Sequence, residues 1–120
     1  MLRIRLEQLE AFSTNQEDNF AERVVRFLQL QFPDAAQEDS SELLTVVKQQ
    51  IVKAESYGIE FEQDLAIYTT AAWLLGADFD TEFPAAFAVL SSPKMQGQRK
   101  AAWLKEFTTE LFSRLLGADR

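Results

Sequence analysis

Three carboxylates stand at alternate positions in LLGADFDTEFP, residues 74–84 of the chain. Asp78, Asp80 and Glu82 offer the oxygen ligands that Ca²⁺ and Mg²⁺ prefer, and paired carboxylates also serve in hydrolases. The run lacks the spacing of an EF-hand loop, because its glycine precedes the acids and no acid closes the loop. The pattern therefore favours a polar loop after a helix, with a cation site and a catalytic acid pair as weaker alternatives.

The residue types missing from the chain exclude many common catalytic sites. The 120 residues contain no histidine and no cysteine. Without histidine there is no imidazole base, histidine triad or imidazole metal ligand, and without cysteine there is no thiol nucleophile, thiolate metal site or disulfide. The sequence therefore predicts a protein that is not an enzyme and carries no cofactor and no metal. A carboxylate-dependent hydrolase using Asp78 and Asp80 stays as a distant alternative.

The negative charge of the chain lies in its middle third. Of 19 acidic residues, seven lie between Lys53 and Lys94, a stretch without Lys or Arg, so the other 12 balance the 12 basic residues and the net charge is −7. Such a surface repels phosphate backbones and anionic lipids, which disfavours nucleic acid as a partner. We therefore expect a basic protein partner to dock on these acids, with a tyrosine as aromatic anchor; the contacts would be Glu55, Tyr57, Glu60, Glu62, Asp64, Asp78, Asp80 and Glu82. A solvated acidic face that only aids solubility is the alternative.

No membrane or export signal is visible in the sequence. The N-terminal stretch MLRIRLEQLE is charged from its third residue and lacks the apolar core of a secretory signal. No run reaches the roughly 18 consecutive apolar residues that a membrane-spanning helix needs. The absence of cysteine also fits a reducing compartment. We expect a cytoplasmic protein with no membrane partner.

Apolar residues recur at helical spacing along most of the chain. They predict helices at about 16–32, 41–57, 60–75, 84–91 and 98–116, interrupted by prolines and glycines. Asp39 or Ser40 is expected to cap the second of these helices. Residues 2–6 alternate apolar and basic side chains, so they form either a short strand or an extended lead-in to a first helix. The pattern predicts one all-α domain over residues 1–120, an irregular bundle of five or six helices.

The acids of the opening stretch fall in the connection between the helices 60–75 and 84–91. We expect Phe79 and Phe83 to point into the core and to leave the three acids in water. The acids Glu60, Glu62 and Asp64 lie at the start of a helix, where the helix dipole stabilises negative charge whether or not a partner binds. The helix 60–75 has a broad apolar surface and should be largely buried.

Several landmarks occur in an order that resembles a known group of proteins. They are Ile4-Arg5-x-Glu7-Gln8-Leu9-x-Ala11-Phe12, Phe20, Phe32-Pro33, Ala54-x-x-Tyr57-Gly58-Ile59 with Asp64 after it, and Leu75-Gly76-x-x-Phe79-Asp80. Over residues 3–90 the chain resembles small, mostly uncharacterised all-α bacterial proteins encoded beside type VI secretion spike, PAAR and toxin genes. Similar proteins often carry His-Leu-Arg where this chain has Phe27-Leu28-Gln29, so no role of that histidine transfers.

The resemblance implies a cytoplasmic helical protein that works with a secreted toxin or its spike. With the charge distribution, it predicts a non-catalytic accessory or adaptor protein that binds a type VI secretion effector or a spike/PAAR component through the acidic segment. The closest alternative is an immunity protein that inhibits a toxin by covering a basic active site, since complementary charge speeds association. Formation of a homo-oligomer through exposed aromatic side chains is a further alternative.

Overall fold

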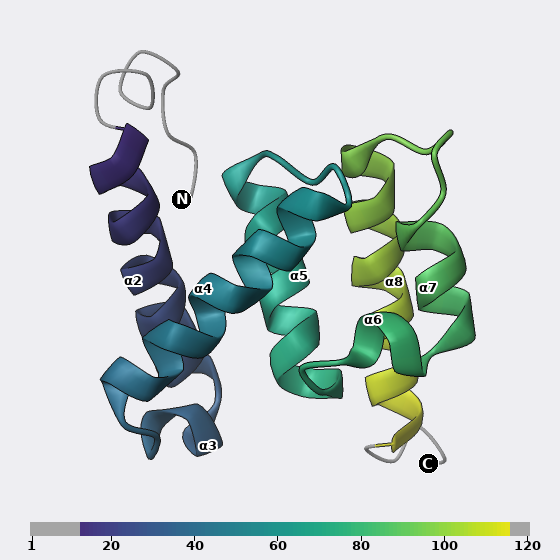
Figure 1. Cartoon of the computed structure of the whole chain (residues 1–120). Coiled ribbons are helices and arrows are strands. Elements are labelled where there is room, and N and C mark those ends of the chain that lie inside the picture. Colours follow the sequence, from purple (N-terminus) through teal and green to yellow (C-terminus); the bar gives the residue numbers. More distant parts are fainter. Residues whose placement is uncertain (1–12, 116–120) are drawn as a thin grey trace.

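The computed structural model describes residues 13–115. Within that range the chain forms helices and no strand, which confirms the all-α prediction (Figure 1). The helices are α2 (Ser13–Gln31), α3 (Pro33–Ala36), α4 (Ser40–Ser56), α5 (Glu62–Leu75), α6 (Phe79–Glu82), α7 (Pro84–Leu90) and α8 (Gly97–Leu115). Five of these helices, α2, α4, α5, α7 and α8, match the predicted ranges closely, and α3 and α6 replace predicted loops. The alternatives for residues 2–6 lie outside the described residues.

Local signals set several helix ends. The Asp39 side chain accepts a hydrogen bond from the Ser41 backbone N–H at 3.1 Å, so Asp39 is the cap of α4. Gly58 and Gly76 take positive φ values of 88° and 115° just after α4 and α5, a backbone conformation that glycine adopts most readily. Pro84 begins α7, where its missing N–H leaves no helical bond unmade.

Helix α5 lies at the centre of the bundle. In Figure 1, α4 crosses in front of α5, α2 stands on one side, and α8 stands on the other with α6 and α7 beside it. Helix α5 has no charged residue from Leu65 to Leu75, and its residues Leu65, Tyr68 and Ala72 are buried. Helix α8 makes the most extensive packing with it. The expected burial of this helix is therefore observed on most, but not all, of its surface.

A buried lysine ties three helices together. Lys100 lies in the first turn of α8, and its ammonium group donates hydrogen bonds of 2.7 Å to the carbonyl oxygens of Tyr57 and Leu90. Tyr57 directly follows α4, and Leu90 is the last residue of α7. Carbonyls at helix C-termini carry partial negative charge, so one cation stabilises two helix ends. Burial lowers the pKa of Lys100 below its usual value, and the two carbonyls compensate for part of the lost hydration.

Replacing this cation is expected to loosen the ends of α4 and α7. We expect Lys100→Met, which keeps the length and apolar stem of the side chain, to lower the free energy of unfolding by about 2 kcal/mol, because hydrogen bonds from a charged donor are lost. Urea denaturation followed by circular dichroism measures the change. Arg99→Met, at the exposed neighbouring position, is the control. Equal stability of the two variants would show that water serves the two carbonyls equally well.

Candidate functional site

The three carboxylates of the opening stretch do not share one environment. Residues 79–82 form the short helix α6, and Phe79 is fully buried, as predicted. Asp80 is also buried, with 2% of its surface exposed, whereas Asp78 and Glu82 are exposed. The prediction that all three acids stay in water is therefore wrong for Asp80. Its inward orientation also removes Asp80 from the predicted docking surface, since a partner cannot reach it.

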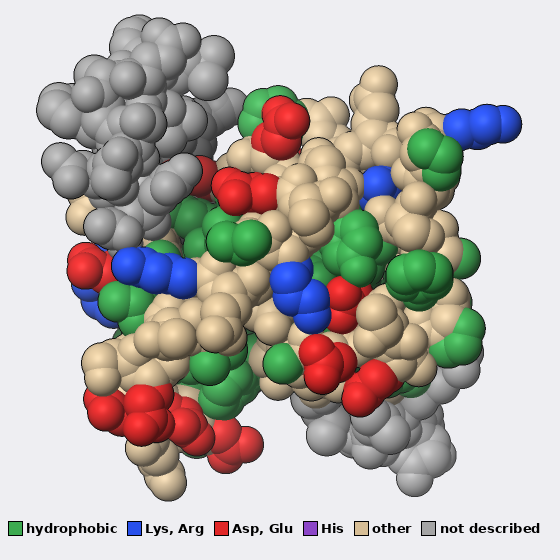
Figure 2. Space-filling view, viewed as in Figure 1, with side chains coloured by type: hydrophobic (Ala, Val, Ile, Leu, Met, Phe, Trp, Pro, Cys, Tyr) green, Lys and Arg blue, Asp and Glu red, His purple; other side chains and the backbone are tan. Residues whose placement is uncertain are grey.

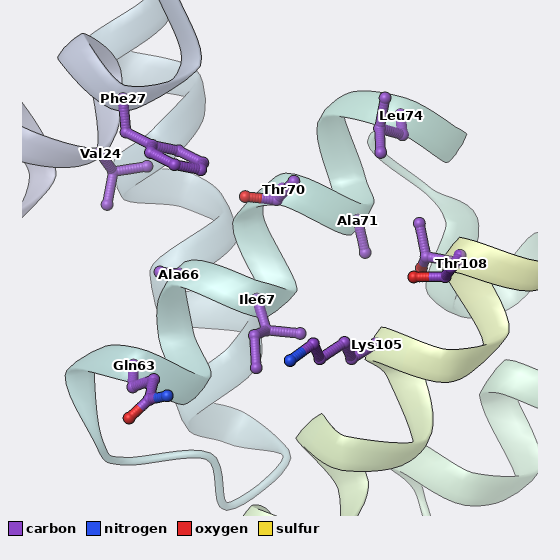
Figure 3. A pocket seen from close by; sticks show the side chains of 11 residues that line it. Val24, Phe27, Gln63, Ala66, Ile67, Thr70, Ala71, Leu74, Lys105 and Thr108 are labelled. Carbon is purple, nitrogen blue, oxygen red and sulfur yellow. The ribbon is translucent and has the colours of Figure 1, made fainter. Parts of the chain in front are cut away.

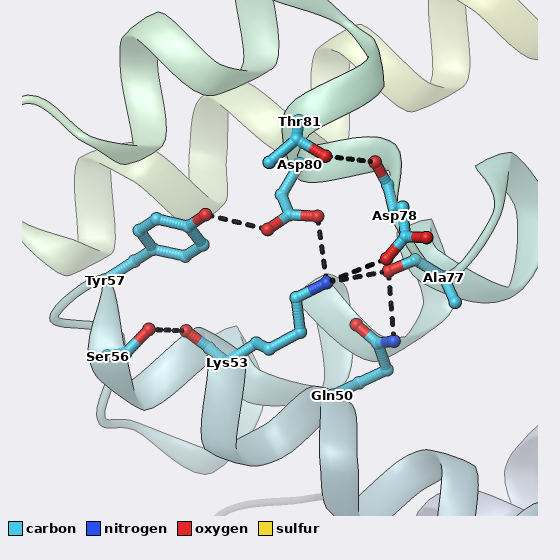
Figure 4. Close-up of polar contacts among 8 residues, drawn as sticks. All are labelled: Gln50, Lys53, Ser56, Tyr57, Ala77, Asp78, Asp80 and Thr81. Atoms are coloured by element: carbon cyan, nitrogen blue, oxygen red, sulfur yellow. Dashed lines mark hydrogen bonds and ion pairs between the residues drawn. The ribbon is translucent and has the colours of Figure 1, made fainter.

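Asp80 turns inward because two side chains at the C-terminal end of α4, one in the helix and one directly after it, meet its charge (Figure 4). The Lys53 ammonium group donates a hydrogen bond of 2.9 Å to Asp80 Oδ1, and the Tyr57 hydroxyl donates one of 2.7 Å to Asp80 Oδ2. Lys53 also donates to the Ala77 carbonyl at 2.9 Å and lies 3.6 Å from Asp78 Oδ1. Lys53 lies in the last turn of α4 and Tyr57 caps the C-terminus of that helix, so the two side chains present adjacent groups to α6.

The pKa values of Asp80 and Tyr57 lie on opposite sides of neutral pH. Burial opposes ionisation of Asp80 more than any single contact favours it, yet the Tyr57 hydrogen bond and Lys53 together hold its pKa below its usual value. The pKa of Tyr57 is raised to about 12, mainly by burial and further by the hydrogen bond to Asp80 and by the negative charge of Asp80. A general acid or base works best with a pKa near the operating pH. The arrangement is suited to holding α6 against α4.

The other acids of the middle segment are also divided. Glu62 forms an ion pair with Arg23 of α2, with both carboxylate oxygens 3.2 Å from the same Arg23 nitrogen. Burial raises the pKa of Glu62, and the Arg23 contact opposes that rise. Asp64 is half-buried, and burial raises its pKa as well. Four members of the predicted set are exposed, Glu55, Glu60, Asp78 and Glu82, while Tyr57, Glu62 and Asp64 are part-buried, and their role as docking contacts stays a prediction.

Basic residues from outside the acidic segment therefore reach into it. Arg23 and Lys53 neutralise part of its charge, a pairing that no local sequence pattern indicates. Figure 2 shows the acidic side chains of one face in separate groups, with uncharged surface and Lys or Arg side chains between them. Within residues 13–115, no group of three or more Asp or Glu residues is arranged to hold a metal ion.

A second feature, which the sequence did not reveal, is a groove between α2, α5 and α8 (Figure 3). Its volume is about 320 Å³. Helix α5 forms its floor with one stripe of side chains, at the spacing of a single helix face: Gln63, Ala66, Ile67, Thr70, Ala71 and Leu74. Val24 and Phe27 of α2 form one wall, and Phe27 is 43% exposed. We call this largely apolar depression the α2–α5–α8 groove. It stays open because α4 covers the opposite side of α5.

The other wall of the groove carries its charged group and two hydroxyl groups. Lys105, Thr108 and Thr109 of α8 line it, and Lys105 is the one charged residue among the groove residues that the structure describes. Thr108 is 8% exposed, and its hydroxyl oxygen has no hydrogen-bond partner. Leaving a buried polar group unpaired costs about 1–3 kcal/mol, so such a group favours an arriving partner that can bond to it.

Comparison of the chain with protein-family models, with curated proteins and with solved structures finds no match. No helix within residues 13–115 combines the length and the apolar composition needed to span a membrane. The geometry of the groove and of the Asp80 cluster is therefore the basis for assigning a function.

Proposed function

We propose that this chain is a non-catalytic protein-binding module, an accessory or adaptor protein, whose α2–α5–α8 groove receives an α-helix of its partner. The observation that carries this proposal is the floor of the groove. Helix α5 is uncharged from Leu65 to Leu75, yet Ile67, Thr70 and Leu74 remain partly exposed. A helix with apolar residues on all sides is normally covered on all sides. A partner helix would supply the missing cover.

The dimensions of the groove suit such a helix. Its floor runs from Gln63 to Leu74, a separation of eleven residues, which corresponds to roughly 16 Å or about three helical turns. Proteins that bind helices in grooves contact anchor side chains spaced three or four residues apart, as the floor residues themselves are. The exposed ring of Phe27 adds an aromatic contact of the kind that dominates many interfaces.

The sequence resemblance supports a type VI secretion effector or a spike/PAAR protein as the partner, met in the cytoplasm of the producing cell. In this proposal the groove supplies the main contact. The exposed acids Glu55, Glu60, Asp78 and Glu82 lie outside the lining of the groove and would speed association with a basic partner. An immunity protein would use the same surfaces, so a separate test must distinguish inhibition from delivery.

Blocking the groove is expected to abolish partner capture. In Thr70→Arg, a long charged side chain rises from the middle of the apolar floor, and we expect at least roughly tenfold weaker binding because a central, desolvated contact is lost. The measurement is co-purification of the tagged chain with each product of its neighbouring genes. Gln49→Arg, which adds the same side chain at an exposed position of α4, is the control.

Capture by the native chain and by Gln49→Arg, but not by Thr70→Arg, would support groove binding, provided that all three melt at similar temperatures. Equal capture by all three would contradict the groove, and capture of no neighbouring product would count against an adaptor role. If the captured protein is a toxin, co-expression decides the role. An inhibitor protects the cell from the toxin, whereas an adaptor alters loading or secretion without protection.

A further inference from the structure

The polar groups on the α8 wall of the groove indicate the chemistry of the partner helix. We infer that this helix is apolar on its docking face and carries one Asp or Glu, whose carboxylate is bound by Lys105 and Thr108. The inference rests on the proposed function and specifies the partner that the groove selects. It concerns the docking helix alone and places the main contact in the groove, whereas the sequence-based expectation placed a basic partner on the acidic segment.

Lys105 supplies the charge for this recognition. It lines the groove, and Figure 3 shows its side chain extending from α8 towards Ile67 on the floor. Among the described residues it forms no ion pair, whereas Arg23 and Lys53 both have carboxylate partners. No Asp or Glu lines the groove. A carboxylate on an incoming helix would therefore meet an unopposed cation, and a basic side chain would be repelled.

Thr108 supplies a second, directional contact. It lies three residues after Lys105, so the two side chains occupy the same face of α8. In Figure 3 both side chains lie on the groove side of α8. The Thr108 hydroxyl is buried and has no partner, although a helical threonine commonly bonds to a carbonyl of the preceding turn. A carboxylate oxygen accepts hydrogen bonds and would accept one from each of these donors, so the pair favours an acid over an amide or a base.

The shape of the groove favours a helix over a small carboxylate. A small molecule held by Lys105 and Thr108 would cover one part of the floor and leave the rest of the stripe from Gln63 to Leu74 in water. A helix of about three turns covers the whole stripe and places an acid beside α8 at the same time. The apolar area along the floor therefore points to a protein segment.

A display library of three-turn amphipathic helical peptides tests the inference on the full chain. Peptides are selected on the native chain and retained only if Thr70→Arg removes their binding. We expect the retained peptides to share an Asp or Glu at one position. We expect Lys105→Glu to bind these peptides roughly tenfold or more weakly. We expect a second selection, on Lys105→Glu, to yield peptides with Lys or Arg in place of that acid.

Thr108→Val tests the contribution of the hydroxyl separately from that of the Lys105 charge. Valine has nearly the same shape, and the hydroxyl has no partner in the free chain, so we expect this variant to keep or raise its melting temperature and to bind the acidic peptides several-fold more weakly. Purely apolar peptides should bind both forms alike. If Thr70→Arg does not fold, Phe27→Glu on the opposite wall serves as the groove-blocking variant, because Phe27 is partly exposed.

The outcomes distinguish the inference from the proposed function. Groove-dependent peptides without a preferred acid, or peptides indifferent to Lys105→Glu, would overturn the inference and leave helix binding intact. The absence of any groove-dependent peptide would overturn both. Because the native chain has no cysteine, Ile67→Cys reports access to the floor through the rate of maleimide labelling. Slow labelling of the free chain would show that the chain itself, or a second copy, already covers the groove, and this too would overturn both.

Discussion

Asp80→Ala is expected to lower the free energy of unfolding by about 3 kcal/mol, the lower end of the range for breaking a buried ion pair. The variant leaves the Lys53 ammonium group and the Tyr57 hydroxyl without the carboxylate that both contact. The lower end applies because the Lys53 side chain is 33% exposed and regains some hydration. Urea denaturation of the full chain measures the effect.

Asp78→Ala is the matched control for this change. Asp78 also faces Lys53, but at 3.6 Å and with 73% of its side chain exposed, so its loss should change stability by less than about 1 kcal/mol. Similar effects of the two variants would mean that burial of Asp80 contributes nothing beyond a surface contact.

The stabilisation by Asp80 should depend on pH in one direction. Its folded-state pKa lies below the ordinary value of 3.8, so its contribution is present above about pH 4 and is lost as the pH falls through the folded-state pKa. Glu62 and Asp64 change stability with pH in the opposite direction. Burial raises their pKa values, so protonation at low pH removes the cost of burying their charges. The difference between the native chain and Asp80→Ala should therefore shrink below pH 4. A difference in the free energy of unfolding that does not change with pH would contradict a lowered pKa of Asp80.

Gly97→Ala is expected to destabilise the protein by about 2 kcal/mol, although alanine normally improves a helix by about 0.5–1 kcal/mol. A methyl group on Gly97 would overlap the carbonyl oxygen of Gly58 and lie 2.9 Å from its carbonyl carbon. The turn between α4 and α5 and the start of α8 would have to separate, and Lys100 bonds to the Tyr57 carbonyl in that same turn.

Gln98→Ala, at the next and exposed position, should be neutral or slightly stabilising. Thermal unfolding of the two variants, followed by circular dichroism, compares them directly. The test depends on the sign of the stability change, because helix propensity alone would make Gly97→Ala more stable than the native chain. A stabilised Gly97→Ala variant would show that α8 and the turn move apart without penalty.

The features that the sequence predicted depend on neighbouring residues. The cap of α4 at Asp39, the glycine turns after α4 and α5, and the start of α7 at Pro84 all follow from the chemistry of a few adjacent positions. Helix α6 was not predicted, because its four residues are too few to show a helical period. It is held by Lys53 and Tyr57, 27 and 23 residues from Asp80.

The candidate site was less predictable than the fold for the same reason. The uncharged run Leu65–Leu75 indicated a buried helix, but the open side of that helix depends on how α2 and α8 lie beside it. The unpaired hydroxyl of Thr108 is likewise a property of its surroundings, since the same residue on an exposed face would bond to water. The acidic segment was visible in the sequence, whereas the cations that neutralise part of it came from elsewhere in the chain.

The position of α8 on α5 also sets the order of events while the chain is being made. Gly97–Leu115 is synthesised after the other described helices, yet it provides the most extensive cover of α5. The uncharged run Leu65–Leu75 therefore leaves the ribosome with α4 available and α8 still missing. During that interval the nascent chain exposes apolar surface of the kind that chaperones bind. We expect that interval to end only once Lys100 has been synthesised, because its hydrogen bonds to the carbonyls of Tyr57 and Leu90 join α8 to the ends of α4 and α7.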